Sequence, residues 1–359
     1  MQKNNTPKYQ VLKAFIIEAI QSKQWLPHEV ITSENVLAEQ FTMSRHTVRQ
    51  AIGQLTNEGW LYRVHGKGTF VQEQLPPARK TIGVITTYIS DYIFPAIIRG
   101  IENVLSQNDC QLMLGCSNQQ VDKERQCLES MRNQQVDGLI IEPAKSGMPN
   151  PNVDLIQKMI ADGLPVLTLQ ACFDGLEHNY VILDDVQAGV TATKHLLDLG
   201  HRRIGGIFKA DLAQGQLRYK GFMDAQTKVG ISLAEERVVL FVGDETGKSI
   251  QTTQYETLLQ NVTAVVCYND LVAVKLMDII KEKGLKIPED ISIVSFDDSQ
   301  LATFSEVKLT SVAHPMEALG EKVASEMLSL LAGTKDVVHE KMLLKLIKRQ
   351  SSKAIDERV

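Results

Sequence analysis

The chain has 359 residues, of which 43% are hydrophobic and 23% are charged, a composition typical of globular proteins with two or three domains. No apolar run approaches the roughly 20 residues that cross a bilayer, and residues 1–25 lack the apolar core of a signal peptide, so we expect a cytoplasmic protein. The net charge of −5 hides an asymmetry, because residues 1–80 carry ten Lys and Arg against six Glu and the rest carry 28 against 37 acidic residues. A basic head on an acidic body is one signature of a nucleic-acid-binding module joined to a second domain.

The head is predicted to contain three helices and a hairpin. Apolar residues recur at helical spacing over residues 8–23, which places Val11, Leu12, Phe15, Ile16, Ala19 and Ile20 on one face. A second helix follows Thr32-Ser33, with Val36, Leu37 and Phe41 facing inward. The third begins after Ser44, a natural N-cap, and ends at Gly59. Residues 60–64 and 69–71 then read as two strands around the turn "HGKG".

The third helix has one apolar face and one basic face. Val48, Ala51, Ile52 and Leu55 point to the core, whereas Arg45 and Arg49, four residues apart, share the outward face with His46, Thr47 and Gln50 beside them. Side chains near the start of a recognition helix reach base edges in the major groove, and the planar fork of arginine matches guanine. At the hairpin tip, His65 and Lys67 supply donors and Gly66 allows the backbone to approach DNA closely.

Residues 8–71, above all "MSRHTVRQAIGQLTNEGWLYRVHGKGTFV", resemble the winged-helix DNA-binding domain of the GntR-type repressors. The resemblance implies that Arg45, His46 and Arg49 contact bases and phosphates in the major groove. It further implies that His65 and Gly66 enter the minor groove and that Lys8 contacts a phosphate. Glu34 also falls at a contact position, although its place at a helix start is equally that of a charge favoured by the helix dipole.

A linker is predicted over residues 72–80, where two prolines interrupt a polar stretch. It separates a head over 1–71 from a body over 81–359. In the body, apolar runs that begin at residues 81, 111, 138, 165, 180, 203, 264 and 292 alternate with amphipathic stretches. This alternation predicts parallel sheets covered by helices on both faces, and the length of the body indicates two lobes.

Polar residues stand at the carboxyl ends of several of these runs, where open α/β sheets bind ligands. They are Glu142, Asp184, Lys209, Asn269 and Asp297, with Asp91 in the loop after the first strand and Arg218 in the segment that follows Lys209. Charged groups and amides that converge in this way suit a ligand made of hydroxyl groups, and Tyr92 and Phe94 would pack on a sugar ring. Because neighbouring strand residues point to opposite faces, Asp184-Asp185 and Asp297-Asp298 each suit one ligand-facing and one structural carboxylate.

Residues 81–350 resemble the effector domain of the lactose/galactose repressor family through "VDGLIIEP", "LDDVQAGVTATKHLLDLGHRRIGGI", "CYNDLVAVKLMDIIKEKGLKIPEDISIVSFDD" and "LTSVAHP". The resemblance implies a fold like that of periplasmic sugar-binding proteins, with Asp184, Arg218, Asn269, Asp297 and His314 contacting the effector. The chain departs from that family in its head and linker, so the family's hinge mechanism does not carry over.

The fusion of these two parts is similar to the arabinose-responsive repressors, in which L-arabinose binds between the lobes and releases the operator. "YISDYIFP" and "EPAKS" match that group and imply that Asp91, Tyr92, Glu142 and Lys145 line the sugar site. We therefore expect a homodimeric repressor that binds double-stranded operator DNA.

Other functions fit the sequence less well. Dinucleotide-binding, P-loop and nucleophile-elbow motifs are absent, and the five cysteines form no Cys-x-x-Cys pair, so we predict no catalytic residue, cofactor or metal. A different pentose, a hexose or a sugar phosphate remains open as the effector, because Arg218 and Lys209 would suit a phosphate. From other classes, a sugar-binding transport protein and a sugar-processing hydrolase remain weaker alternatives.

Overall fold

The computed structural model describes residues 8–64, 66–73, 79–90, 92–232, 234–244 and 246–355. The chain forms two compact units whose residues contact mainly one another, Met1–Arg79 and Lys80–Val359, which we call the head and the body. The linker predicted over 72–80 stays a prediction, since residues 74–78 lie outside the described residues. In the described parts of the chain, no helix is long and apolar enough to cross a membrane.

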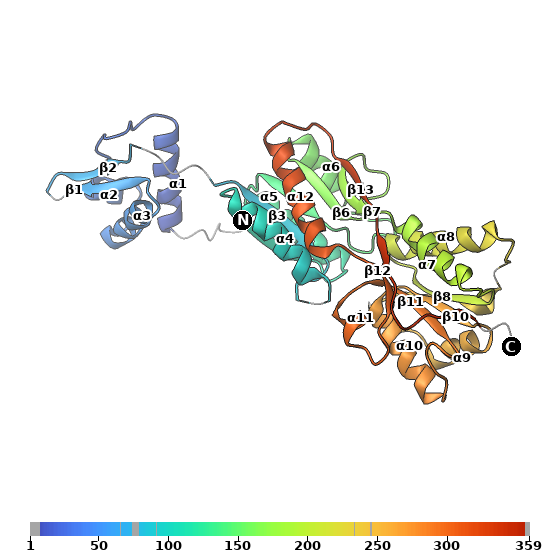
Figure 1. The fold of residues 1–359 in the computed structure, drawn as a ribbon. Helices are drawn as coiled ribbons and strands as arrows, with labels where there is room; N and C mark the ends of the chain where they lie inside the picture. Colours follow the sequence, from blue (N-terminus) through green and yellow to red (C-terminus); the bar gives the residue numbers. More distant parts are fainter. Residues whose placement is uncertain are drawn as a thin grey trace. The chain divides into compact units, whose positions relative to one another are not determined.

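The head has the predicted winged-helix order (Figure 1). Its elements are α1 (Lys8–Gln21), α2 (Glu34–Gln40), α3 (Arg45–Asn57), β1 (Leu61–Val64) and β2 (Gly68–Val71). The two strands pair in antiparallel register from Leu61 opposite Val71 to Val64 opposite Gly68. One core joins these elements, with Leu12, Ile16, Leu37, Ile52 and Leu55 fully buried or nearly so.

Two apolar residues of the head do not face inward as predicted. Val11 is 44% exposed and Val36 is 51% exposed, whereas their neighbours Leu12 and Leu37 are fully buried. Successive residues of a helix differ by about 100° around its axis, so a helix that buries Leu37 turns Val36 toward solvent. The seven-residue α2 is too short to bury more than a narrow stripe.

The first lobe of the body is a parallel six-stranded sheet in the order β13-β7-β6-β5-β3-β4. Its strands are β3 (Thr81–Thr86), β4 (Gln111–Cys116), β5 (Gly138–Ile141), β6 (Val166–Gln170), β7 (Asn179–Leu183) and β13 (His339–Met342). The helices α4 (Phe94–Gln107) and α12 (Met316–Leu331) cover one face, and α5 (Val121–Asn133) and α6 (Val153–Ala161) cover the other.

The second lobe repeats this plan with the order β14-β12-β11-β10-β8-β9, in which β14 alone runs antiparallel to its neighbour. Its strands are β8 (Ile204–Lys209), β9 (Val238–Phe241), β10 (Ala264–Cys267), β11 (Ser292–Asp297), β12 (Thr310–Ala313) and β14 (Lys345–Ile347). One face carries α7 (Asp185–Asp198) and α8 (Ala213–Lys228), and the other carries α9 (Thr252–Gln260) and α10 (Asp270–Glu282). A 3-10 turn (Glu235–Arg237) and the short α11 (Gln300–Phe304) complete the lobe.

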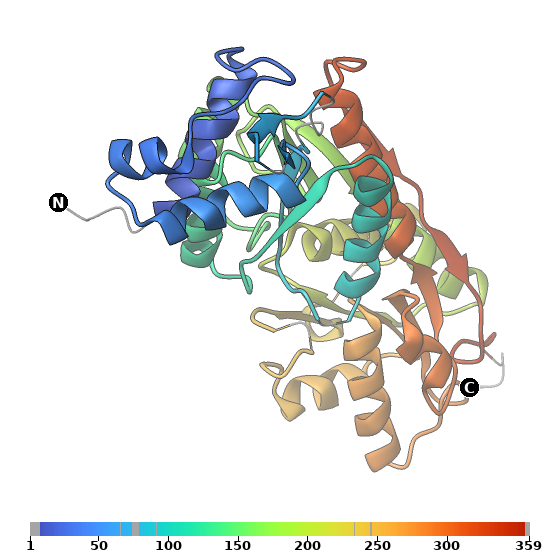
Figure 2. The same ribbon diagram turned by 90° about the vertical axis from the view of Figure 1, so that its left-hand side faces the viewer.

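The chain passes between the lobes three times in the described residues, after β7, after β12 and after β13. As a consequence, α12 and β13, from late in the chain, lie in the first lobe (Figure 1). In Figure 2, α12 runs beside α4, the helix against which it packs most extensively. These crossings confirm the predicted two-lobed α/β body and place the carboxyl ends of both sheets toward a shared region.

Every predicted strand of the body is present, with ends that differ by a few residues. The strands β9, β12, β13 and β14 are additional to the predicted ones. β9, β13 and β14 are three- or four-residue strands, and each is a sheet edge. All five cysteines are free, and Cys267 is buried in the core of the second lobe.

Candidate functional site

The exposed face of α3 presents the predicted DNA-contacting side chains together. Ser44 caps the helix, since its hydroxyl accepts a hydrogen bond from the backbone N–H of Thr47 at 3.1 Å. This cap fixes the first turn, on which Arg45 and His46 are exposed. Arg49 and Gln50 are exposed one turn later, while Val48 is fully buried beneath them.

Glu34 connects three elements of this surface. Its carboxylate accepts a hydrogen bond from Arg49 Nε at 2.8 Å and lies 3.5 Å from Arg63 Nη2 of β1. Arg63, which is not among the predicted DNA-contacting residues, therefore belongs to the same basic surface. The carboxylate orients both guanidinium groups, but the exposure of the pairs limits their contribution to stability.

The turn between β1 and β2 and the start of α1 add further hydrogen-bond donors to the basic surface. Gly66 and Lys67 are exposed at the tip, and Gly66 adopts a φ of +73°, a left-handed conformation that glycine adopts without strain. Lys8 donates to the carbonyl of Thr42 at 3.4 Å and is exposed at the start of α1. His65 lies outside the described residues.

A cavity between the lobes of the body gathers six of the predicted effector residues. The first lobe supplies Tyr92, Phe94 and Glu142, and the second supplies Arg218 and Asp297. His314 comes from the crossing between β12 and α12. Residues of both lobes thus line one cavity, which we call the effector cavity.

Arg218 is buried in the wall of the effector cavity with two carboxylates. Its Nε lies 2.8 Å from Asp185 Oδ1, its Nη1 donates to the carbonyl of Tyr268 at 2.8 Å, and its Nη2 lies 3.5 Å from Asp297 Oδ1. Burial alone would lower the pKa of Arg218, but the carboxylates of Asp185 and Asp297 outweigh burial and raise it. Burial raises the pKa of both aspartates, and the guanidinium opposes that shift.

The close packing of α7 on α8 makes this arrangement possible. A side chain at Gly189 would collide with the carbonyl of Arg218, and one at Gly221 would collide with the carbonyl of Val186. The two glycines therefore let the helices approach until Arg218 meets Asp185, the first residue of α7.

Glu142 and His314 face the cavity without a partner of opposite charge in the described residues. Glu142 accepts hydrogen bonds from the backbone and hydroxyl of Thr87 at 3.0 and 2.6 Å, and burial raises its pKa to about 7. Burial lowers the pKa of His314 to about 3, so its ring is neutral at physiological pH. Its Nδ1 finds no hydrogen-bond partner among the described residues.

Tyr92 reaches from the first lobe to the second. Its phenol oxygen accepts a hydrogen bond from the backbone N–H of Asp270 at 3.2 Å, and its own backbone has a φ of +59°. Burial and the carboxylates of Asp297 and Asp270 raise the pKa of this phenol. The side chain is thus held by its hydroxyl as well as by ring packing.

Four predicted effector residues do not line the cavity. Asp184 caps α7 and pairs with Lys341 at 3.2 Å, because the helix begins at Asp185 and turns that carboxylate, not Asp184, toward Arg218. Lys209 is buried and pairs with Asp211 at 2.8 Å. Lys145 is exposed, and Asn269 caps α10 by accepting from Val272 N–H at 2.9 Å. Asp91 lies outside the described residues.

Several polar residues of the site are not among those predicted from the sequence. Gln119, Gln170 and Gln214 line the cavity, and Asp185 stands behind Arg218. An amide carries no distinctive motif, and only the Asp-Asp pair at 184–185 gave a signal that one member would be structural.

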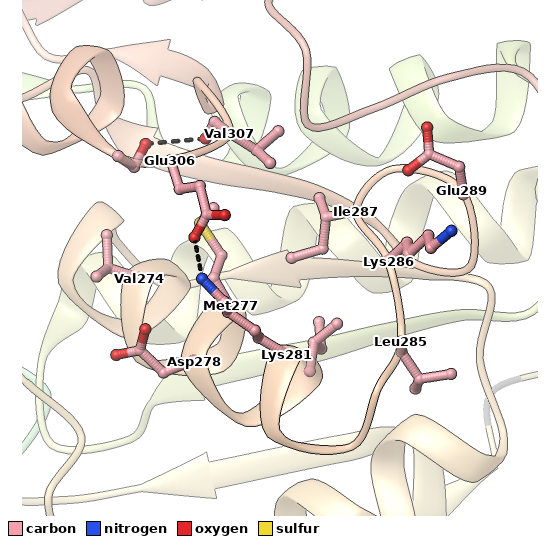
Figure 3. A pocket seen from close by; sticks show the side chains of 12 residues that line it. Val274, Met277, Asp278, Lys281, Leu285, Lys286, Ile287, Glu289, Glu306 and Val307 are labelled. Atoms are coloured by element: carbon pink, nitrogen blue, oxygen red, sulfur yellow. Dashed lines mark hydrogen bonds and ion pairs between the residues drawn. The ribbon is translucent and has the colours of Figure 1, made fainter.

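A separate groove lies on the second lobe beside α10 (Figure 3). Val274, Leu285 and Ile287 line it, and the ion pair between Lys281 and Glu306 spans it at 2.6 Å. It shares no residue with the effector cavity and lacks that cavity's convergent buried polar groups.

Two family descriptions match the chain. Residues 8–71 match "Bacterial regulatory proteins, gntR family", and residues 193–352 match "Periplasmic binding protein-like domain". Among solved structures, the transcription regulator CcpA of Lactococcus lactis is similar at a TM-score of 0.68 and 26% identity, covering 77% of this chain and 100% of that one. A LacI family regulator from Enterococcus faecium with bound ribose is similar at a TM-score of 0.64 and 26% identity, with the same coverage.

Two relatives extend this likeness over nearly the whole chain. The arabinose metabolism transcriptional repressor of Halalkalibacterium halodurans is 40% identical over 90% of this chain and 89% of its own length. That of Geobacillus stearothermophilus is 41% identical over 92% of this chain and 93% of its own. The chain belongs to the family of arabinose metabolism transcriptional repressors, in which a GntR-type winged helix is joined to a LacI-type sugar-binding domain.

Proposed function

We propose that this repressor acts in the cytoplasm, binds a two-fold symmetric operator as a homodimer, and releases it when L-arabinose enters the effector cavity. The observation that carries the proposal is the meeting of buried polar groups from both lobes in one cavity of a DNA-binding protein. The names of the two relatives support L-arabinose, and the ribose in the Enterococcus faecium neighbour supports a ligand of pentose size.

The charges at the cavity favour an uncharged sugar over a sugar phosphate. The positive charge of Arg218 is already shared by Asp185 and Asp297, and Glu142 adds another acidic group. Lys209, the other cation that would suit a phosphate, is paired with Asp211 outside the cavity lining. A phosphate would therefore meet more negative than positive charge, whereas hydroxyl groups can donate to the carboxylates.

The lobes supply the means of response. Glu142 belongs to the first lobe and Arg218 to the second, so a sugar that bonds to both stabilises one relative placement of the lobes. Only a difference in sugar affinity between two placements can shift their populations. A homodimer is proposed because a winged helix reads one half-site, and two-fold operators match two-fold proteins.

The test combines DNA selection with calorimetry on the full chain. The purified chain is expected to select a palindromic sequence from a random duplex library, and L-arabinose should weaken the resulting complex. D-Ribose, D-galactose and D-ribose 5-phosphate serve as comparison ligands in calorimetry. Tighter binding of the phosphate than of every neutral sugar would overturn the assignment, and failure to bind any duplex would favour a transport-type sugar-binding protein.

A variant separates the two activities. Arg45→Ala should weaken operator binding by about 1–3 kcal/mol, because Arg45 is exposed where a recognition helix contacts bases. Its sugar affinity should equal that of the unmodified chain. An unchanged gel shift would remove Arg45 from the DNA interface.

A further inference from the structure

A chain of buried hydrogen bonds leads from β3 to the crossing that holds His314. The hydroxyl of Thr87 donates to Glu142 Oε2 at 2.6 Å, and Gln170 Nε2 donates to Glu142 Oε1 at 2.9 Å. Gln170 Oε1 lies 2.9 Å from His314 Nε2. Each of the four side chains is at least nine-tenths buried, so water does not readily replace any of these contacts.

The chemistry of each group fixes the direction of this chain. Above about pH 7 Glu142 is ionised, and an ionised carboxylate only accepts, so Gln170 must turn its amide nitrogen toward Glu142. The amide oxygen then faces His314 and can only accept, which requires a proton on His314 Nε2. Because the buried ring is neutral, its Nδ1 carries no proton and is an acceptor.

The backbone holds Gln170 in this position. Gln170 ends β6 with a φ of +65°, a left-handed conformation that is costly for a residue other than glycine. The next backbone N–H, of Ala171, turns back to the carbonyl of Leu169 at 2.7 Å. The backbone N–H of His314 donates to the carbonyl of Asp297 at 3.2 Å, which anchors the ring to the second lobe. The amide of Gln170 therefore joins the first lobe to a residue anchored on the second.

We propose that Gln170 is a positioning residue through which the carboxylate of Glu142 fixes the proton of His314 on Nε2. His314 Nδ1 then accepts a hydrogen bond from one hydroxyl of the sugar. We call the hydrogen bonds from Thr87 through Glu142 and Gln170 to His314 the relay. The direction of the relay depends only on this chain, whereas the identity of the sugar rests on the proposed function. His314 lines the cavity, and its Nδ1 is buried without a hydrogen-bond partner among the described residues, so it is the acceptor left for the ligand.

The isosteric substitution Glu142→Gln reverses the relay. The amide oxygen of the new glutamine would accept the two hydrogen bonds from Thr87, and its amide nitrogen would donate a hydrogen bond to Gln170. Gln170 would then turn its oxygen toward residue 142 and its nitrogen toward His314. The ring would accept at Nε2 and carry its proton on Nδ1, which makes it a donor to the ligand.

Nitrogen NMR of histidine-labelled full chain tests the direction without any sugar. At about pH 8.5, where Glu142 is ionised, we expect the Nε2–H form of His314 in the unmodified chain and the Nδ1–H form in Glu142→Gln. The signal is assigned by its loss in His314→Gln. Glu124→Gln is the matched control, because Glu124 is a buried carboxylate bonded to Asn150, Asn152 and Ala144 and not to Gln170. The control should keep the Nε2–H form.

The Nδ1–H form in the unmodified chain would overturn the proposal even if Glu142→Gln failed to fold. The same form in the unmodified chain and in Glu142→Gln would overturn it as well.

Calorimetry with monodeoxy and monodeoxyfluoro L-arabinoses tests the acceptor role, since a C–F group never donates. At one ring position, both analogues should bind the unmodified chain roughly fivefold to tenfold more weakly than L-arabinose. In Glu142→Gln the fluoro analogue at that position should bind severalfold more tightly than the deoxy analogue. Equal affinities of the two analogues for both proteins at every position would overturn the acceptor role. No binding of L-arabinose at all would instead overturn the proposed ligand, and the NMR result would still decide the relay.

Discussion

The buried charges of Asp185, Arg218 and Asp297 stabilise one another because none can reach bulk water. The guanidinium also lies over the rings of Phe296 and Tyr268, with its central carbon 4.6 and 5.3 Å from their centroids. Removing one member of such a group leaves the others without compensation, which costs more than the group contributes when it is complete. The side chains that would bind the sugar are therefore also side chains on which the second lobe depends.

Arg218→Met should lower the free energy of unfolding of the body by about 3–5 kcal/mol, because it leaves two buried carboxylates without a cation. Adding Asp185→Asn should restore part of the loss, since one of the uncompensated charges is then gone. Urea unfolding followed by far-ultraviolet circular dichroism measures both. Trp25 and Trp60, both in the head, give an internal control, because their fluorescence transition should not move. If the body of Arg218→Met were as stable as that of the unmodified chain, the expected loss of stability would be contradicted.

Glu142 makes the stability of the body depend on pH. Its pKa is about 7 in the folded chain and 4.5 ordinarily, because burial disfavours the charged form. Between these values the folded chain binds a proton that the unfolded chain has lost, so the free energy of unfolding falls as pH rises. The fall is about 1.4 kcal/mol per pH unit and on the order of 3 kcal/mol in all.

The measurement compares Glu142→Gln with the unmodified chain in urea from about pH 5 to pH 8. Asp270, whose pKa burial raises to about 6, contributes with the same sign, and His314 contributes with the opposite sign. Both groups are present in the two proteins, so the difference between the curves isolates Glu142. The variant should gain stability relative to the unmodified chain as pH rises. If the free energies of unfolding of the two proteins changed in parallel with pH, Glu142 would not be a source of the pH dependence.

At the scale of elements, the crossing of α7 and α8 controls the geometry of the cavity wall. Gly189→Ala inserts a methyl group against the backbone of Arg218, which cannot yield as a flexible side chain would. We expect a loss of about 1–3 kcal/mol in the free energy of unfolding of the body and a weaker affinity for L-arabinose. Lys220→Ala, at an exposed position of α8, is the matched control and should change neither quantity. Unfolding and calorimetry with both variants decide whether the helix spacing sets the site.

Much of the architecture was predictable, because buried parallel strands such as β5 and β11 are continuous apolar runs. The short edge strands β9, β13 and β14 have no such signal. The site was predictable where a charged residue ended a strand, as for Glu142 and Asp297. It was not predictable at Asp184, because the start of α7 decides which carboxylate faces Arg218. Gln170 gains its role only from its left-handed backbone and its contact with His314, 144 residues away.

At the scale of the molecule, any repressor that a sugar releases must couple its two binding reactions equally in both directions. If saturating L-arabinose weakens operator binding by some factor, saturating operator must weaken L-arabinose binding by the same factor, because both follow one thermodynamic cycle. Couplings of this kind are typically about 5-fold to 150-fold. Calorimetric titration of L-arabinose with and without the selected operator, beside gel shifts with and without sugar, measures both sides.

The two factors are expected to agree, and a variant shows where the coupling arises. Arg45→Ala, which should still bind sugar, is expected to show a smaller effect of operator on its sugar affinity than the unmodified chain, at an operator concentration that just saturates the unmodified chain. If operator lowered sugar affinity equally in this variant, the effect would come from DNA bound elsewhere than α3. If sugar weakened operator binding while operator left sugar affinity unchanged, the sugar would be acting by a route other than equilibrium binding in the effector cavity.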